Sequence, residues 1–154
     1  MIIKITLFIN LLMYAFVISQ SFFYILAMSG ALKKMQATTY IETRNLLTEK
    51  LKAPLQLVYY ITLGTSLLLT AFCVVNPSGW MFICSVISLV ALVADMLIAV
   101  KGNIPLNTYI NTWTTGSYPN NWQDYRAKWF SLYHTRQAIN ITGFVSLLVG
   151  WVFV

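Results

Sequence analysis

Four long apolar runs decide what this chain can fold into. They cover about residues 5–32, 55–75, 80–100 and 130–154, and each reaches the length of roughly 20 predominantly apolar residues that a helix needs to cross a bilayer. A spanning segment must satisfy its backbone hydrogen bonds within itself, which favours helices. The runs therefore predict an all-α membrane protein, a transmembrane four-helix bundle that forms a single domain over residues 1–154.

The composition supports this class of protein. The 154 residues are 58% hydrophobic and only 9% charged, whereas soluble domains are about 25% charged. A disordered chain is excluded too, because disorder needs low hydrophobicity and high charge. The net charge of +6 would favour a nucleic-acid partner for a soluble protein. Here the basic residues lie mainly between the apolar runs, where membrane orientation explains them, so we expect membrane lipid and no nucleic acid as the partner.

The distribution of charge predicts an orientation. In a four-span protein, the connections 33–53 and 101–129 lie on the same side of the membrane. Together they hold eight basic residues, while Lys4 stands alone on the opposite side: Lys33, Lys34, Arg44, Lys50, Lys52, Lys101, Arg126 and Lys128. Cytoplasmic loops carry an excess of Lys and Arg. We therefore expect an integral protein of a bacterial inner membrane, with both long connections in the cytoplasm and both termini outside.

The two long connections differ in pattern. Residues 33–53 alternate apolar and polar side chains at partly helical spacing, which predicts an interfacial amphipathic helix. Pro54 then suits the first turn of the second span. Residues 101–129 are long for a link between two membrane helices, and loops of that length are usually functional or disordered. Their many Trp and Tyr side chains argue against disorder and predict an ordered cap.

Residues 76–79, Asn-Pro-Ser-Gly, predict a tight turn between the second and third spans. Cys73 and Cys84 flank this hairpin at similar depth. As small hydrophobic side chains they suit a core, and a disulfide between them is possible only if this end faces an oxidising compartment.

Asp95 is the acidic residue that falls inside a predicted span. It lies about five residues, or roughly 8 Å, from the basic end of its helix. A lone carboxylate at that depth is costly unless it is paired, protonated or hydrated. Arg136 lies at a similar depth in the last span, so the sequence predicts an Asp95–Arg136 ion pair. Such a pair either fixes helix register or forms the polar end of a ligand pocket.

The single histidine, His134, excludes a metal site built from several histidines. Histidine side chains in general titrate near neutrality and so suit proton transfer, although a hydrogen-bonded structural role fits equally well. Trp122, Arg126 and Trp129 recur at spacings of four and three, which places them on one helical face. They form either an aromatic belt with a snorkelling arginine or a pocket wall for an aromatic or anionic ligand.

Asn103 and Asn107 flank Pro105, just after the third span. A proline disfavours the helical conformation of the residue before it, which predicts that the helix ends here with an extended residue. The two asparagine amides then either cap the helix end or face the mouth of a pocket.

The element Asn103-x-Pro105-Leu106-Asn107 and the run Trp122…Arg126…Trp129…His134-Thr135-Arg136 resemble the anthrone-oxygenase-like family. These are small four-helix membrane proteins, in bacteria largely a domain of unknown function. The resemblance is best over residues 95–154, and the first half matches only in layout. Characterised fungal members oxidise a polycyclic anthrone to a quinone with molecular oxygen and without an organic cofactor.

The resemblance implies a role for each residue of that run. His134 would act as the base that removes a carbon-bound proton, and Arg126, Arg136 or Asn107 would stabilise the resulting oxyanion. Trp122 and Trp129 would stack on the rings of the substrate. No metal and no cofactor is expected.

We therefore expect a pocket at one bilayer face for a small apolar or aromatic ligand, and the family resemblance implies oxygenase activity at His134 and Arg136. The ligand-binding residues would be Asp95, Asn103, Asn107, Trp122, Arg126 and Trp129. The alternative is a non-catalytic membrane subunit, either a homo-oligomer or the partner of another chain. Small residues such as Gly64, Gly143 and Gly150 would then permit close packing between helices.

Overall fold

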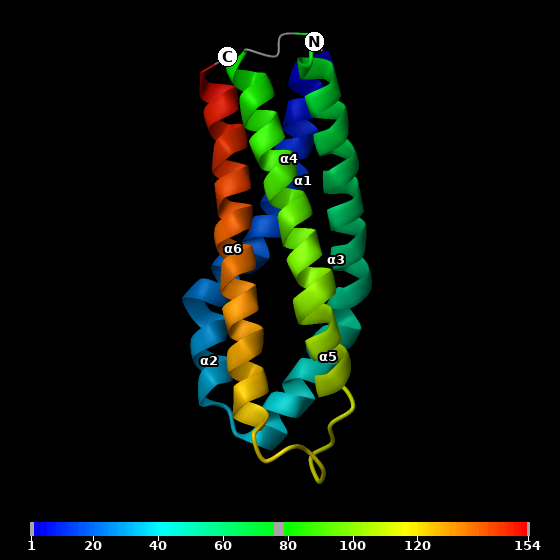
Figure 1. Ribbon diagram of the computed structural model, residues 1–154, viewed down its shortest axis with the longest axis vertical. Helices are drawn as coiled ribbons and strands as arrows, with labels where there is room; N and C mark the ends of the chain where they lie inside the picture. The colour runs from blue at the N-terminus through cyan, green and yellow to red at the C-terminus, as the bar shows by residue number, and fades with distance from the viewer. Residues whose placement is uncertain (1, 76–78, 154) are drawn as a thin grey trace.

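The computed structural model describes residues 2–75 and 79–153, which form an elongated bundle of helices (Figure 1). Its first arm is α1 (Ile2–Phe23), continued by the π-helical turn η1 (Tyr24–Met28) and α2 (Ser29–Lys34). The second arm is α3 (Ala37–Cys73). The third is α4 (Trp80–Ile98), continued by η2 (Ala99–Asn103), also π-helical, and α5 (Ile104–Ile110); the fourth is α6 (Trp122–Val152). The described residues contain no β-strand beyond an isolated bridge between Thr114 and Ser117.

Both ends of the chain lie at one end of the bundle, and the α2–α3 and α5–α6 links lie at the other (Figure 1). The predicted all-helical class is confirmed. Three arms are long and apolar enough to cross a membrane, namely Ile2–Lys34, Ala37–Cys73 and Trp80–Ile110. Large apolar side chains such as Phe8, Leu26 and Val90 are exposed on their outer surfaces, as expected for helices that face lipid. The fourth arm, α6, is equally long but more polar.

The boundary predicted at Pro54 is wrong. The amphipathic segment and the second span form one continuous helix, α3, with Pro54 inside it. A proline inside a helix removes one hydrogen bond, which would otherwise reach the carbonyl of Lys50. Both residues are exposed, so water or lipid headgroups can satisfy that carbonyl. The N-terminal part of α3 turns beneath the bundle toward the start of α6 (Figure 1).

The helix end predicted at Pro105 is also wrong. Ile104 is helical, with φ −65° and ψ −49°, and the chain stays helical through η2 to Ile110. Pro105 occupies the first turn of α5, where its missing N–H matters little. The π-helical turn before it shifts the hydrogen-bond register. Much of the predicted 101–129 cap is thus helix, and the remaining link is anchored by the buried side chain of Trp113.

Two apolar clusters fill the bundle, one toward the termini and one toward the links. A polar layer separates them along each arm. In α6, Tyr133 belongs to the cluster toward the links and Leu147 to the cluster toward the termini. The buried side chains of Gln137 and Asn140 lie between them. The polar layer of the bundle is where the candidate site lies.

The residues at the predicted hairpin behave as packing residues. Cys73 and Cys84 are both buried and free, so no disulfide joins them. A Cβ atom on Gly143 would come within 2.2 Å of the Tyr14 hydroxyl oxygen, and one on Gly150 within 2.9 Å of the Cys84 Cβ. These two glycines therefore permit close helix approach as predicted, whereas Gly64 faces open space. Residues 76–78 of the predicted turn lie outside the described residues.

Candidate functional site

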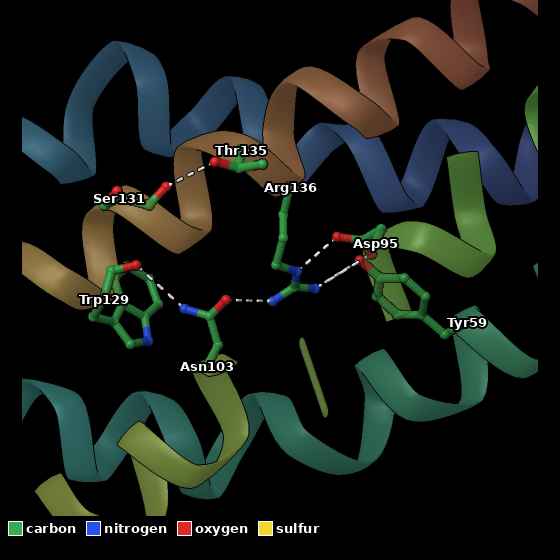
Figure 2. A network of polar contacts seen from close by, with 7 residues as sticks. All are labelled: Tyr59, Asp95, Asn103, Trp129, Ser131, Thr135 and Arg136. Atoms are coloured by element: carbon green, nitrogen blue, oxygen red, sulfur yellow. Dashed lines mark hydrogen bonds and ion pairs between the residues drawn. The ribbon is translucent and has the colours of Figure 1, made fainter. Parts of the chain in front are cut away.

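The predicted Asp95–Arg136 ion pair is present at the centre of the polar layer (Figure 2). Arg136 Nε donates to Asp95 Oδ1 at 2.6 Å, and Arg136 Nη2 lies 3.4 Å from Asp95 Oδ2. Asp95 is completely buried. A carboxylate in that position requires a paired cation and further hydrogen bonds. The Arg136 guanidinium, which contacts both carboxylate oxygens, is that cation. The pair joins α4 to α6.

The Arg136 guanidinium also connects the other elements of the site. Nη2 donates to the Tyr59 hydroxyl oxygen of α3 at 3.2 Å, and Nη1 contacts Asn103 Oδ1 of η2 at 3.4 Å. The amide nitrogen of Asn103 donates in turn to the backbone carbonyl of Trp129 at 3.2 Å. Figure 2 shows Tyr59 of α3 and Asp95 and Asn103 of the α4–η2 arm around the guanidinium of Arg136, which comes from α6. The network fixes how Arg136 is oriented.

A second buried guanidinium, that of Arg44, lies nearer the link end of the bundle. Its side chain comes from the N-terminal part of α3, and the residue is only 4% exposed. Arg44 Nη2 donates to Asn107 Oδ1, which also accepts a hydrogen bond of 2.8 Å from the Trp129 indole. The guanidinium carbon lies 4.2 Å from the centre of the Trp129 ring, so a cation–π contact orients it.

Both guanidinium groups line a cavity of about 490 Å³ between α3 and the α4–η2–α5 arm. Its volume falls within the range of small-molecule pockets. Polar side chains form the inner wall: Arg44, Tyr59, Asn103, Asn107 and Arg136. Apolar side chains form much of the remainder: Leu47, Leu51, Leu55, Met96 and Val100. Tyr60, Val100 and Ile104 are exposed at its rim, so the cavity opens on the outer surface of the bundle.

Several predicted ligand-binding residues come together here. Asn103, Asn107, Trp129 and Arg136 all line the cavity. Asp95 stands behind Arg136 and neutralises it without lining the cavity. The structure therefore brings these residues together, with Arg136 and Asp95 in the middle of the bundle and Asn107 nearer its link end.

Trp122 and Arg126 lie elsewhere. Arg126 Nη1 donates to the backbone carbonyls of Leu32 and Met35, at 3.0 and 3.1 Å. Its guanidinium carbon lies 4.5 Å from the centre of the Trp122 ring. These contacts tie the C-terminal end of α2 to the start of α6. Trp122 and Arg126 thus pack the start of α6 against α2. Of the three residues predicted on this helical face, only Trp129 lines the cavity.

His134 is separated from the cavity. Its side chain is exposed on the outer face of α6, where Nδ1 lies 2.8 Å from Gln137 Oε1 and the ring stacks on Phe130. Together with Lys33 and Arg126 it lines a shallower depression outside the bundle. Adjacent helical positions differ by about 100° around the axis, so two steps turn His134 far from the inward direction of Arg136. The structure does not bring this predicted pair into one pocket.

Sequence reasoning missed two residues of the polar inner wall, Tyr59 and Arg44. Arg44 was counted among the surface charges of the amphipathic segment. The sequence did contain a pattern that indicates a buried position for Arg44. Ile41, Arg44, Leu51 and Leu55 follow one another at helical spacings, so Arg44 interrupts the apolar face of that helix rather than belonging to its polar face.

No protein-family model, curated protein or solved structure matches this chain. The resemblance to the anthrone-oxygenase-like family therefore stays a prediction.

Proposed function

We propose that this chain is an integral membrane protein with four spanning helices that binds a small ligand with an apolar or aromatic body in the cavity beside α3. The observation that carries the proposal is the character of the cavity walls. The cavity opens on the apolar outer surface and is closed inside by Arg44, Asn103, Asn107 and Arg136. Ligand pockets typically combine a mostly apolar lining with a few convergent polar groups.

The inward direction of its polar residues supports α6 as the fourth span. Gln137 and Asn140 are buried, and Gln137 Nε2 donates to the backbone carbonyl of Ser21 at 3.1 Å. Arg136 is paired with Asp95 inside the bundle. Polar residues within membrane spans are expected to face protein rather than lipid. These three groups of α6 are thus compatible with a helix that crosses the bilayer.

The same proposal includes an orientation. The α2–α3 and α5–α6 links lie together at the end opposite the termini (Figure 1), and this end holds most of the basic residues. By the positive-inside rule, the links and the nearby cavity belong on the cytoplasmic side, with both termini outside.

The oxygenase reaction implied by the family resemblance is a narrower proposal for the same cavity. Trp129 and Tyr133 favour it, because both line the cavity and their rings stack at 4.7 Å with an interplanar angle of 15°. That pair offers a platform for a flat ligand. His134 lies outside the cavity, so proton removal within it would fall to another group. Oxygen uptake on addition of anthrone, measured against protein-free nanodiscs, tests this narrower proposal.

Photolabelling tests the binding proposal. Purified protein in phosphatidylcholine nanodiscs is irradiated with a diazirine-bearing hexadecanol, and the labelled peptides are mapped by mass spectrometry. We expect labels on the cavity walls of α3 and the α4–η2–α5 arm. Ala99→Phe, which fills the cavity, should remove them, and Ala138→Phe on the exposed face of α6 should not. Labels spread evenly over the outer surface and unchanged in Ala99→Phe would refute the proposal.

A further inference from the structure

Arg44 and Arg136 are both buried arginines, but they are satisfied differently. Arg136 has Asp95 at 2.6 Å. Among the described residues Arg44 has no carboxylate within salt-bridge distance, and the other ion pair found there, Lys50–Glu49, is exposed. A buried charge without a counter-charge is strongly unfavourable. The bundle thus supplies a carboxylate for one guanidinium and leaves the other without one.

The hydrogen bonds of Arg44 are also incomplete. A guanidinium carries five N–H donors in a planar fork. Asn107 Oδ1 accepts from Nη2, and the Trp129 indole competes for that same oxygen atom. The Nε group of Arg44 is buried and has no partner among the described residues. The Arg44 guanidinium therefore has N–H donors without an acceptor, and Arg44 lines the cavity.

The surroundings of Arg44 favour an anion over a neutral group. Lys52 also lines the cavity, while no carboxylate does so among its lining residues. The charge of Arg136 is balanced by Asp95 behind it. The cavity therefore has an excess of positive charge, with its buried part at Arg44. Planar guanidinium groups match the two oxygens of a carboxylate or a phosphate.

The apolar part of the cavity gives the rest of the ligand's shape. Leu47, Leu51 and Leu55 of α3 follow Arg44 along one side, and Val100 and Ile104 lie on the other. This apolar surface leads from the guanidinium to the exposed rim of the bundle. A ligand bound there would place an acidic head at Arg44 and extend an apolar tail toward lipid.

We infer that the cavity binds an amphipathic oxyanion, with a carboxylate or phosphate head held by Arg44, beside Asn107 and Trp129, and an apolar tail directed to the bilayer. This inference rests on the proposed function and names its ligand class. Two sources supply such a head, a free long-chain carboxylate and an anionic phospholipid, and they are distinguished by competition.

The test compares two probes that share one tail. Diazirine-bearing palmitic acid and the matching diazirine-bearing hexadecanol are each titrated over the same range of mole fractions in phosphatidylcholine nanodiscs, at a pH that keeps the carboxylate ionised. Wild-type protein should label its cavity peptides at about tenfold lower concentration of acid than of alcohol, because a charge-assisted hydrogen bond is worth at least one decade of affinity. Unlabelled palmitate and phosphatidic acid are then compared as competitors of the acid probe. Displacement at lower mole fraction by palmitate assigns a free carboxylate, and displacement at lower mole fraction by phosphatidic acid assigns a lipid phosphate.

Arg44→Gln should abolish the advantage of the acid over the alcohol. Arg44→Lys, which keeps the charge but loses the fork, should retain part of the advantage and covers the case in which Arg44→Gln does not fold. Lys128→Gln removes the same charge at an exposed position of α6 and should change nothing. Equal labelling by acid and alcohol in wild-type protein would overturn the inference while leaving the cavity proposal standing. Absence of cavity labelling by either probe would overturn both.

Discussion

The Arg136 guanidinium contacts both carboxylate oxygens of Asp95, with Nε 2.6 Å from Oδ1. This contact joins α6 to α4 in the layer that separates the two apolar clusters. It also presents the remaining face of the guanidinium to Tyr59, Asn103 and the cavity. The pair thus has a packing role and a positioning role, which can be separated by mutation.

The first prediction concerns the strength of this pair. Asp95→Asn should lower the free energy of unfolding by about 3 to 5 kcal/mol, because it leaves a buried guanidinium without a counter-charge. Arg136→Gln should have a similar effect. The double variant should be less destabilised than the sum of the single effects. Unfolding in mixed detergent micelles, followed by circular dichroism, measures all three; strictly additive values would contradict the pair.

The second prediction concerns helix approach at Gly143. Gly143→Ala should destabilise the bundle by about 1 to 3 kcal/mol, the usual range for overpacking, because its Cβ would lie 2.2 Å from Tyr14 Oη and 2.9 Å from Ala91 Cβ. Tyr14→Phe in the same chain should recover part of the loss by removing the nearest atom. Gly64→Ala is the matched control, since nothing lies within 4 Å of its Cβ. Equal unfolding midpoints for the two alanine variants would exclude the close approach.

The third prediction concerns Arg126, which holds the end of α2 against the start of α6 and does not line the cavity. Arg126→Ala should cost about 1 to 3 kcal/mol of stability through its lost hydrogen bonds to backbone carbonyls. Hydrogen exchange in residues 33–36 should rise, because Arg126 holds the carbonyls of Leu32 and Met35. Hexadecanol labelling of the cavity should be unchanged, because Arg126 does not line it. A loss of cavity labelling without any change in hydrogen exchange would contradict this assignment.

The fourth prediction concerns His134. As an exposed residue outside the cavity, it should tolerate His134→Ala within about 0.5 kcal/mol of wild-type stability. Binding of the palmitate and hexadecanol probes should also be unaffected. If the same substitution abolished binding of either probe in a folded protein, the outer location of the imidazole would be wrong.

The ion pair could be predicted from sequence because a carboxylate inside an apolar run has few ways to be satisfied, and Arg136 lay at matching depth. The helix boundaries near Pro54 and Pro105 could not be predicted from sequence. Pro54 and Pro105 are sound local signals for a helix boundary, but tertiary packing tolerates one in the middle of α3 and the other after a π-helical turn. Local propensity is a weak prior that tertiary contacts override.

The composition of the site was predictable only in part. Asn103, Asn107, Trp129 and Arg136 were found because they cluster in the sequence after Asp95. Arg44 is about 60 residues away from Asn107 along the chain, and only the turn of α3 beneath the bundle brings the two together. His134 was grouped with Arg136 by proximity in sequence, although two helical steps point them in different directions.

Ligand binding beside Arg44 can be observed in a crystal structure of the protein grown from a lipidic mesophase doped with palmitate. We expect elongated density between α3 and the α4–η2–α5 arm, with its head within hydrogen-bonding distance of the Arg44 guanidinium and its tail leaving past Val100. A structure in which α3 closes on α5, with Leu51 packed against Ile104 and no space beside Arg44, would contradict this expectation.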